Sequence, residues 1–154
     1  MQEYELLKFI KSKYQVRFEI IEHDLQNYNT PGDYYFNEGT LVFAASMLPD
    51  IREPMAIIIH EVTEVALLMK KHPTMPLKDI IEMVEAFDHE FEARRAAGLE
   101  AKDAEPGDHP DAPYYMEHQE ATKAERAYIE RLGINWEGYD DRVTATRDTY
   151  TPKR

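Results

Sequence analysis

Apolar and polar positions alternate along this chain with two different periods. Apolar residues recur every three to four positions, as in amphipathic helices, at Gln2–Lys13, Arg52–Lys71, Pro76–Ala97 and Tyr114–Leu132. Short segments rich in β-branched and aromatic residues predict strands at Val16–Ile21, Tyr34–Asn37 and Thr40–Ala44. We therefore expect an α+β fold: an N-terminal helix, a small three-stranded, mostly antiparallel sheet, and then three helices.

Proline and glycine divide this pattern into units. Glu38 and Gly39 separate the last two strands as a hairpin turn, and the proline-rich segment Ala104–Pro113 must be a loop. We expect a single domain over residues 1–133, with residues 134–154 as a C-terminal extension. In that extension Trp136 and Tyr139 should dock on the domain, while about the last ten residues should be loose.

Composition narrows the range of functions. The 154 residues are 43% hydrophobic and 31% charged, which is ordinary for a globular protein. The formal net charge of −12 opposes nucleic-acid binding, and no apolar stretch is long enough to span a membrane. The first residues, MQEYELLKFIKSK, contain no apolar signal segment, so we expect a cytoplasmic protein. Because cysteine is absent, any metal ion must be held by His, Asp or Glu.

The most unusual stretch is Met55–Lys71, where three ionisable residues interrupt an apolar run. His60 and Glu64 are four positions apart, so a helix places them on one face with Glu61 beside them. This is the spacing of the HExxH zinc helix, in which the outer residues bind the metal and the inner Glu activates water. The pattern predicts His60 and Glu64 as ligands and Glu61 as the catalytic base. Zinc is expected, and a carboxylate ligand also makes Mn or Fe possible.

A metal site needs at least a third protein ligand, and the later helices offer two sources. On the helix Tyr114–Leu132, His118 and Glu125 fall on the apolar stripe. The helix Pro76–Ala97 carries a second set of candidates in the segment Asp88-His89-Glu90-Phe91-Glu92. The pattern alone leaves open whether His118, Glu90, Glu92 or Asp88 completes the site.

The region of about Tyr34–Ala97 resembles the zincin metallopeptidases, especially small ones of the gluzincin type. In that family a short sheet with an edge strand precedes the HExxH helix, and a following helix supplies a ligand from a Glu-x-x-Ala pattern. Glu90 to Ala93 matches this pattern, so the resemblance implies Glu90 as a metal ligand. The chain departs from the family at Glu64, where the family has His.

About two thirds of the chain also resembles a group of small uncharacterised bacteriophage proteins. The shared pattern is HExxE, then FDxxxE, then EPGD-P-APY-EH-AT-ER. This resemblance implies a phage setting, hence a host cytoplasm, and a single linked site. It favours His118, Asp88 and Glu92 as members of that site.

Three functions follow from these patterns. The first is a metal-dependent hydrolase acting on peptide or amide bonds, with a peptide or protein as substrate. The second is a zincin-like protein that binds metal without turnover. The third is a Mg²⁺-dependent nucleotide pyrophosphatase, since Glu61-x-x-Glu64 and Glu85-x-x-Asp88 resemble the ExxE and ExxD pairs of the all-α MazG-like enzymes.

Overall fold

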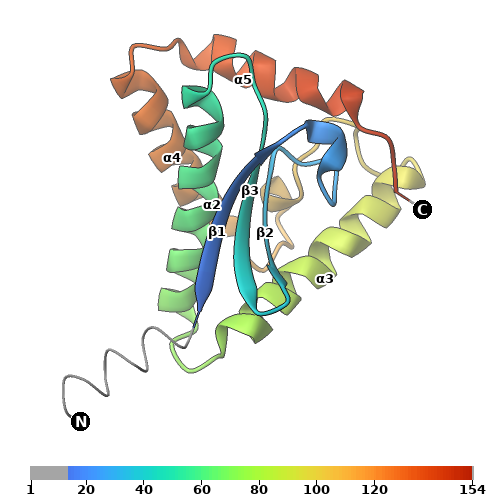
Figure 1. Ribbon diagram of the computed structural model, residues 1–154. Helices are drawn as coiled ribbons and strands as arrows, with labels where there is room; N and C mark the ends of the chain where they lie inside the picture. Colours follow the sequence, from blue (N-terminus) through green and yellow to red (C-terminus); the bar gives the residue numbers. More distant parts are fainter. Residues whose placement is uncertain (1–13, 154) are drawn as a thin grey trace, which may run out of the picture.

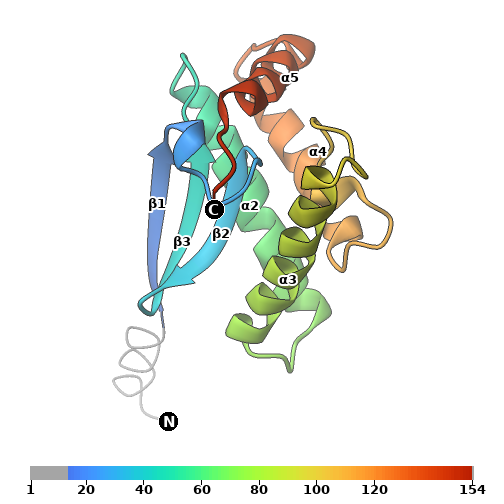
Figure 2. The same ribbon diagram turned by 90° about the vertical axis from the view of Figure 1, so that its right-hand side faces the viewer.

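The fold is a three-stranded sheet with helices packed on one side of it (Figures 1 and 2). The computed structural model describes residues 14–153, so the predicted helix Gln2–Lys13 lies outside the described range. The strands are β1 (Gln15–Ile21), β2 (Gly32–Asn37) and β3 (Thr40–Ser46). The helices are α2 (Arg52–Lys71), α3 (Leu77–Ala96), α4 (Tyr115–Arg131) and α5 (Trp136–Ala145). The predicted α+β class is confirmed.

The sheet has the order β1-β3-β2, with the most buried strand, β3, in the middle. Strands β2 and β3 form the predicted hairpin, and its turn residues Glu38 and Gly39 have φ angles of 49° and 81°. Positive φ at both central positions is the geometry that matches the twist of a two-residue hairpin. Strand β1 pairs with β3 in parallel, so the sheet is mixed. Strand β2 is left as an edge strand.

Local sequence signals explain the bounds of the long helices. Helix α2 ends at Lys71, where Lys70 and Lys71 complement the negative end of the helix dipole before Pro73. Helix α3 ends in a Schellman motif, with Leu99 N–H donating to Arg94 O (2.9 Å) and Gly98 at φ 77°. None of the helices within the described residues is long and apolar enough to cross a membrane.

Helix α5 was not predicted from the sequence. It lies near the carboxyl ends of β1 and β3 (Figure 1), and Asn135 caps it by accepting a hydrogen bond from Gly138 N–H (2.8 Å). Tyr139 and Val143 of α5 are buried in a hydrophobic cluster with residues of β3, α2 and α4. Tyr139 docks as expected, with only 1% of its surface exposed. The segment after residue 133 therefore contributes to the core.

Candidate metal centre

The polar centre of the molecule lies where helices α2 and α4 pack together. His60 and Glu64 project from adjacent turns of α2, and His118 faces them from the first turns of α4. All three side chains are buried. Three of their atoms converge: His60 Nε2 lies 3.2 Å from Glu64 Oε2, His118 Nδ1 lies 3.0 Å from the same oxygen, and the two nitrogens are 3.0 Å apart.

This spacing fits a bound metal ion. Zinc–ligand bonds of about 2.0–2.2 Å in tetrahedral geometry place neighbouring ligand atoms roughly 3.4 Å apart. Two imidazole nitrogens and a carboxylate oxygen are also a normal donor set for a zinc-class ion. Among residues 14–153, His60, Glu64 and His118 are the one group of three metal-ligating side chains whose donor atoms all lie within 4.8 Å of one another.

The outer nitrogen of each histidine contacts a second carboxylate. His60 Nδ1 lies 2.9 Å from Glu125 Oε1, and His118 Nε2 lies 3.4 Å from Asp108 Oδ1. When these outer nitrogens carry the proton and donate it to the carboxylates, each neutral ring turns a bare inner nitrogen toward Glu64. Carboxylate–histidine pairs of this kind orient the histidine ligands of metal sites.

Two tyrosines hold the carboxylates in place. Tyr34 on β2 donates its hydroxyl hydrogen bond to Glu64 Oε1 (2.6 Å), which leaves Oε2 facing the histidines. Tyr139 on α5 donates to Glu125 Oε2 (2.5 Å) and so fixes the group that orients His60. The centre therefore depends on contacts from the sheet and from α5 as well as on α2 and α4.

Without a cation, the converging acceptor atoms would have to share protons. Burial opposes charge on His118, but hydrogen bonds to Asp108 and Glu64 raise its pKa to about 10. Burial likewise opposes charge on His60, yet hydrogen bonds to Glu125 and Glu64 raise the pKa of that ring well above its ordinary value. The same contacts lower the pKa of Glu64 to about 2, against the effect of its burial. Protons and a metal ion therefore compete for the same three atoms.

Glu61 lies beside the three converging residues and is only 8% exposed. Burial raises the pKa of its carboxyl well above the ordinary value, although the charge of His60 opposes this. Within residues 14–153 no hydrogen bond to its side chain is found. An added Cβ at Gly32 would overlap the Glu61 carboxyl, so the close approach of β2 requires glycine at that position.

A second glycine permits the approach of the loop that covers His118. The short 3₁₀ helix Pro106–Asp108 places Gly107 against the imidazole, and an added Cβ there would overlap the ring. The next residue, Asp108, then reaches His118 Nε2 and also accepts a hydrogen bond from Gln119 Nε2 (3.0 Å). The loop predicted between helices thus supplies part of the centre.

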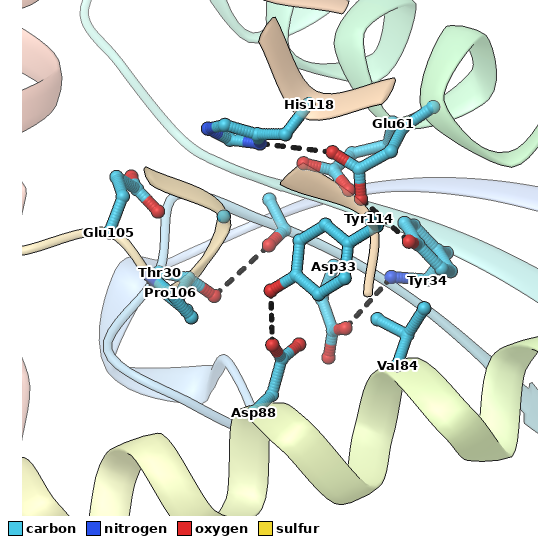
Figure 3. Close-up of a pocket in the computed structure, with 13 residues that line it drawn as sticks. Thr30, Asp33, Tyr34, Glu61, Val84, Asp88, Glu105, Pro106, Tyr114 and His118 are labelled. Atoms are coloured by element: carbon cyan, nitrogen blue, oxygen red, sulfur yellow. Dashed lines mark hydrogen bonds and ion pairs between the residues drawn. The ribbon is translucent and has the colours of Figure 1, made fainter. Parts of the chain in front are cut away.

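Two cavities adjoin the centre, and Glu61 and His118 line both. The smaller, which we call the chamber, has a volume of about 30 Å³, and its lining includes Asp33, Glu64, Asp88 and Tyr114 (Figure 3). The larger has a volume of about 160 Å³ and opens on the His60 and Glu125 side. Ile57, Trp136 and Val143 form its apolar wall. Glu61 therefore lies beside the candidate metal ligands and lines two spaces in which small groups can be held.

Comparison with family models, with curated proteins and with solved structures finds no match to this chain. The zincin and phage-protein resemblances therefore stay predictions, and the functional argument depends on the geometry of the centre.

The structure brings together three of the five predicted ligands, His60, Glu64 and His118, and places the other two elsewhere. Glu90 is exposed, because the buried face of α3 is the one that carries Asp88 and Phe91. Glu92 pairs with Arg95 (3.3 Å) and lines a separate cavity near the C-terminal segment. The match to the Glu-x-x-Ala pattern therefore does not identify a ligand here.

The four carboxylates that the nucleotide pyrophosphatase hypothesis requires at one site do not all lie together. Glu61, Glu64 and Asp88 line the chamber, but Glu85 is half-buried and lines neither cavity. The sheet is a further difference from an all-α enzyme.

Sequence reasoning missed Tyr34, Asp108 and Tyr139, which orient the ligands. Tyr34 and Tyr139 reach their partners from a strand and a helix that are distant in sequence, and Asp108 reaches His118 from the loop before α4. None of the three forms a local sequence pattern with the residue that it contacts. The sequence of the loop Glu105–Asp108 does contain a signal for the contact made by Asp108. A glycine next to an acidic residue in a proline-rich loop lets the backbone approach a neighbouring side chain closely.

Replacing Tyr139 with Phe should weaken metal binding without unfolding the protein. The change removes the hydroxyl that holds Glu125, so His60 loses its fixed orientation, and zinc affinity should fall about tenfold. Competition with a chromophoric chelator measures this. The matched control is Tyr128→Phe on α4, whose hydroxyl has Met55 sulfur (4.0 Å) as its one hydrogen-bond partner among the described residues. Equal zinc affinities for the two variants would contradict the proposed orienting role.

Zinc affinity should rise with pH. Because the pKa of His118 is raised to about 10 and that of His60 is also raised well above its ordinary value, zinc must displace a proton from each ring, and affinity should increase roughly a hundredfold per pH unit between pH 6 and pH 8. The metal-free protein should become less stable as pH rises. The pKa of His118 in the folded protein is about 10, above its ordinary value of 6.5, so the proton on His118 stabilises the fold. That stabilisation is complete below about pH 6.5 and is lost as the pH rises toward 10. A zinc affinity that does not change with pH would exclude a protonated His118 at the site.

Proposed function

We propose that the protein is a metal-dependent hydrolase of the zincin type that acts on peptide or amide bonds. The observation that carries the proposal is the convergence of His60 Nε2, Glu64 Oε2 and His118 Nδ1 beside the buried carboxyl of Glu61. When bound there, a zinc-class ion supplies Lewis-acid chemistry, which polarises a carbonyl and makes water more acidic.

In this proposal Glu61 is the general base. It takes a proton from the attacking water and later delivers it to the leaving amine. Burial raises the pKa of this carboxyl above that of an ordinary Glu, which makes its ionised form a stronger base. No hydrogen bond to the Glu61 side chain is found within the described residues, so its carboxylate is open to water.

Two features near the centre suit an extended peptide. Strand β2 is an edge of the sheet and begins beside Glu61, so a peptide can add to it by main-chain hydrogen bonds. The cavity of about 160 Å³ lies on the other side of Glu61 and is large enough for a side chain next to the scissile bond. Its wall of Ile57, Trp136 and Val143 offers that side chain an apolar surface.

The carboxylate of Glu64, which stands where an HExxH helix has its second histidine, favours a second candidate function: a protein that binds metal without turnover. A carboxylate ligand adds negative charge and makes the bound ion a weaker Lewis acid than two histidines would. It also allows Mn²⁺ or Fe²⁺ in place of zinc. The two candidates share one metal site and differ only in whether Glu61 has a catalytic role.

Glu61→Gln separates these candidates. Purified protein should contain about one zinc per chain, and the variant should keep it, since Glu61 is outside the ligand group. Cleavage of a mixed fluorogenic peptide library should fall by about 10²–10⁴-fold, because the amide cannot accept the proton. His118→Ala is the contrasting variant and should bind zinc far more weakly and lose cleavage.

Other outcomes would change the assignment. Loss of zinc from Glu61→Gln would make Glu61 a ligand. Zinc binding by the unmodified protein without cleavage of any peptide would favour the binding protein. Failure of the unmodified protein to bind zinc, Mn²⁺ or Fe²⁺ would contradict both candidates.

A further inference from the structure

The chamber beside the proposed metal site gathers an unusual amount of buried negative charge. Asp33 from β2, Glu61 and Glu64 from α2, and Asp88 from α3 all line it, and none is more than 9% exposed. In Figure 3, Asp88 points up from α3 and Asp33 points into the same space below His118. Burying a carboxylate without a compensating cation or proton is unfavourable by several kcal/mol.

The neighbours of these carboxylates do not balance this charge. Glu64 is engaged by Tyr34 and the two histidines. The other three carboxylates have only neutral donors or none. Asp33 accepts from Asn27 Nδ2 (3.2 Å) and Tyr34 N–H (2.8 Å), Asp88 accepts from the Tyr114 hydroxyl, and Glu61 has no hydrogen-bond partner within residues 14–153.

No cationic side chain in the chamber lining compensates these carboxylates within the described residues. Glu105 also lines the chamber, and its own negative charge is balanced by Arg147. His118 is the single basic residue among the described residues that line the space, and its two ring nitrogens face Glu64 and Asp108. Within residues 14–153, these three buried carboxylates therefore form no ion pair, although the charges of His60 and His118 act on Glu61 from nearby.

We propose that Asp33, Asp88 and one carboxylate oxygen of Glu61 bind a second divalent cation in the chamber, so that the centre holds two metal ions side by side and the other oxygen of Glu61 stays open to water. The volume of about 30 Å³ matches the space of a single water molecule or small ion. All donors are oxygens, which is the preference of Mn²⁺ and Mg²⁺, whereas the neighbouring site offers two imidazole nitrogens. The two sites therefore select different ions, and this inference does not depend on the protein being a hydrolase.

The second ion binds more weakly than the first. Among the described residues, only His60, Glu64 and His118 already present three donor atoms within 4.8 Å of one another. The chamber carboxylates must move inward to close around an ion, and that rearrangement reduces affinity. Two classes of site, one tight and one weak, are therefore expected.

The test uses the full chain loaded with one equivalent of zinc and titrated with Mn²⁺. Electron paramagnetic resonance reports free and bound Mn²⁺, and metal analysis of the same sample reports zinc. About one Mn²⁺ should bind per chain while the zinc content stays at one. Asp33→Asn and Asp88→Asn should each weaken Mn²⁺ binding at least tenfold and keep the zinc.

Glu90→Gln is the matched control on α3, because Glu90 is exposed and should leave both ions bound. Circular dichroism establishes that each variant is folded, and the titration of the unmodified protein stands even if a variant is not. The proposal is overturned if zinc-loaded protein binds no Mn²⁺ at millimolar concentration, which would mean that protons neutralise the chamber. It is also overturned if each Mn²⁺ gained displaces a zinc, or if folded Asp33→Asn and Asp88→Asn bind Mn²⁺ as tightly as Glu90→Gln.

Discussion

Helices α2 and α4 meet across three polar atoms that all carry lone pairs, at separations of 3.0–3.2 Å. Atoms of this kind repel one another in a buried interface unless protons or a cation lie between them. The packing of the two helices, and so the position of everything attached to them, depends on how that repulsion is relieved. A metal ion relieves it with one charged group, whereas protons must occupy both histidines.

The rest of the fold is arranged to keep these atoms in place. Strand β2 brings Tyr34 to Glu64, the loop after α3 brings Asp108 to His118, and α5 brings Tyr139 to Glu125. Two glycines, Gly32 and Gly107, allow backbone to pass against Glu61 and His118 at distances that a side chain would prevent. Contacts from these three elements hold the ligand atoms in place before any ion binds, which favours metal affinity because little ordering is needed on binding.

The sequence predicted those features whose cause is local. The bounds of α2 follow from periodicity and proline, and the pairing of His60 with Glu64 follows from the geometry of one helical turn. The apolar stripe of α4 also placed His118 and Glu125 inward, and both reach the centre. Neither placement required knowledge of the tertiary structure.

Features set by distant parts of the chain were not predictable in this way. Parallel pairing of β1 with β3 depends on strands that are not neighbours in sequence, and α5 has too few apolar residues to stand out. Glu90 was inferred from family resemblance, but the face of α3 that turns inward is chosen by Phe91 and Val84, and that choice leaves Glu90 in solvent. The raised pKa of Glu61 likewise results from burial beneath β2, which no local pattern reveals.

The most direct test of the central claim is zinc-edge X-ray absorption on protein loaded with one equivalent of zinc. The proposed centre predicts a first shell of nitrogen and oxygen atoms at about 2.0–2.1 Å, with outer-shell scattering from two imidazole rings. Replacing His118 with Ala should remove one of the two rings from that signal. A spectrum without imidazole scattering, or one that His118→Ala leaves unchanged, would contradict the assignment of His60, Glu64 and His118 as the metal ligands.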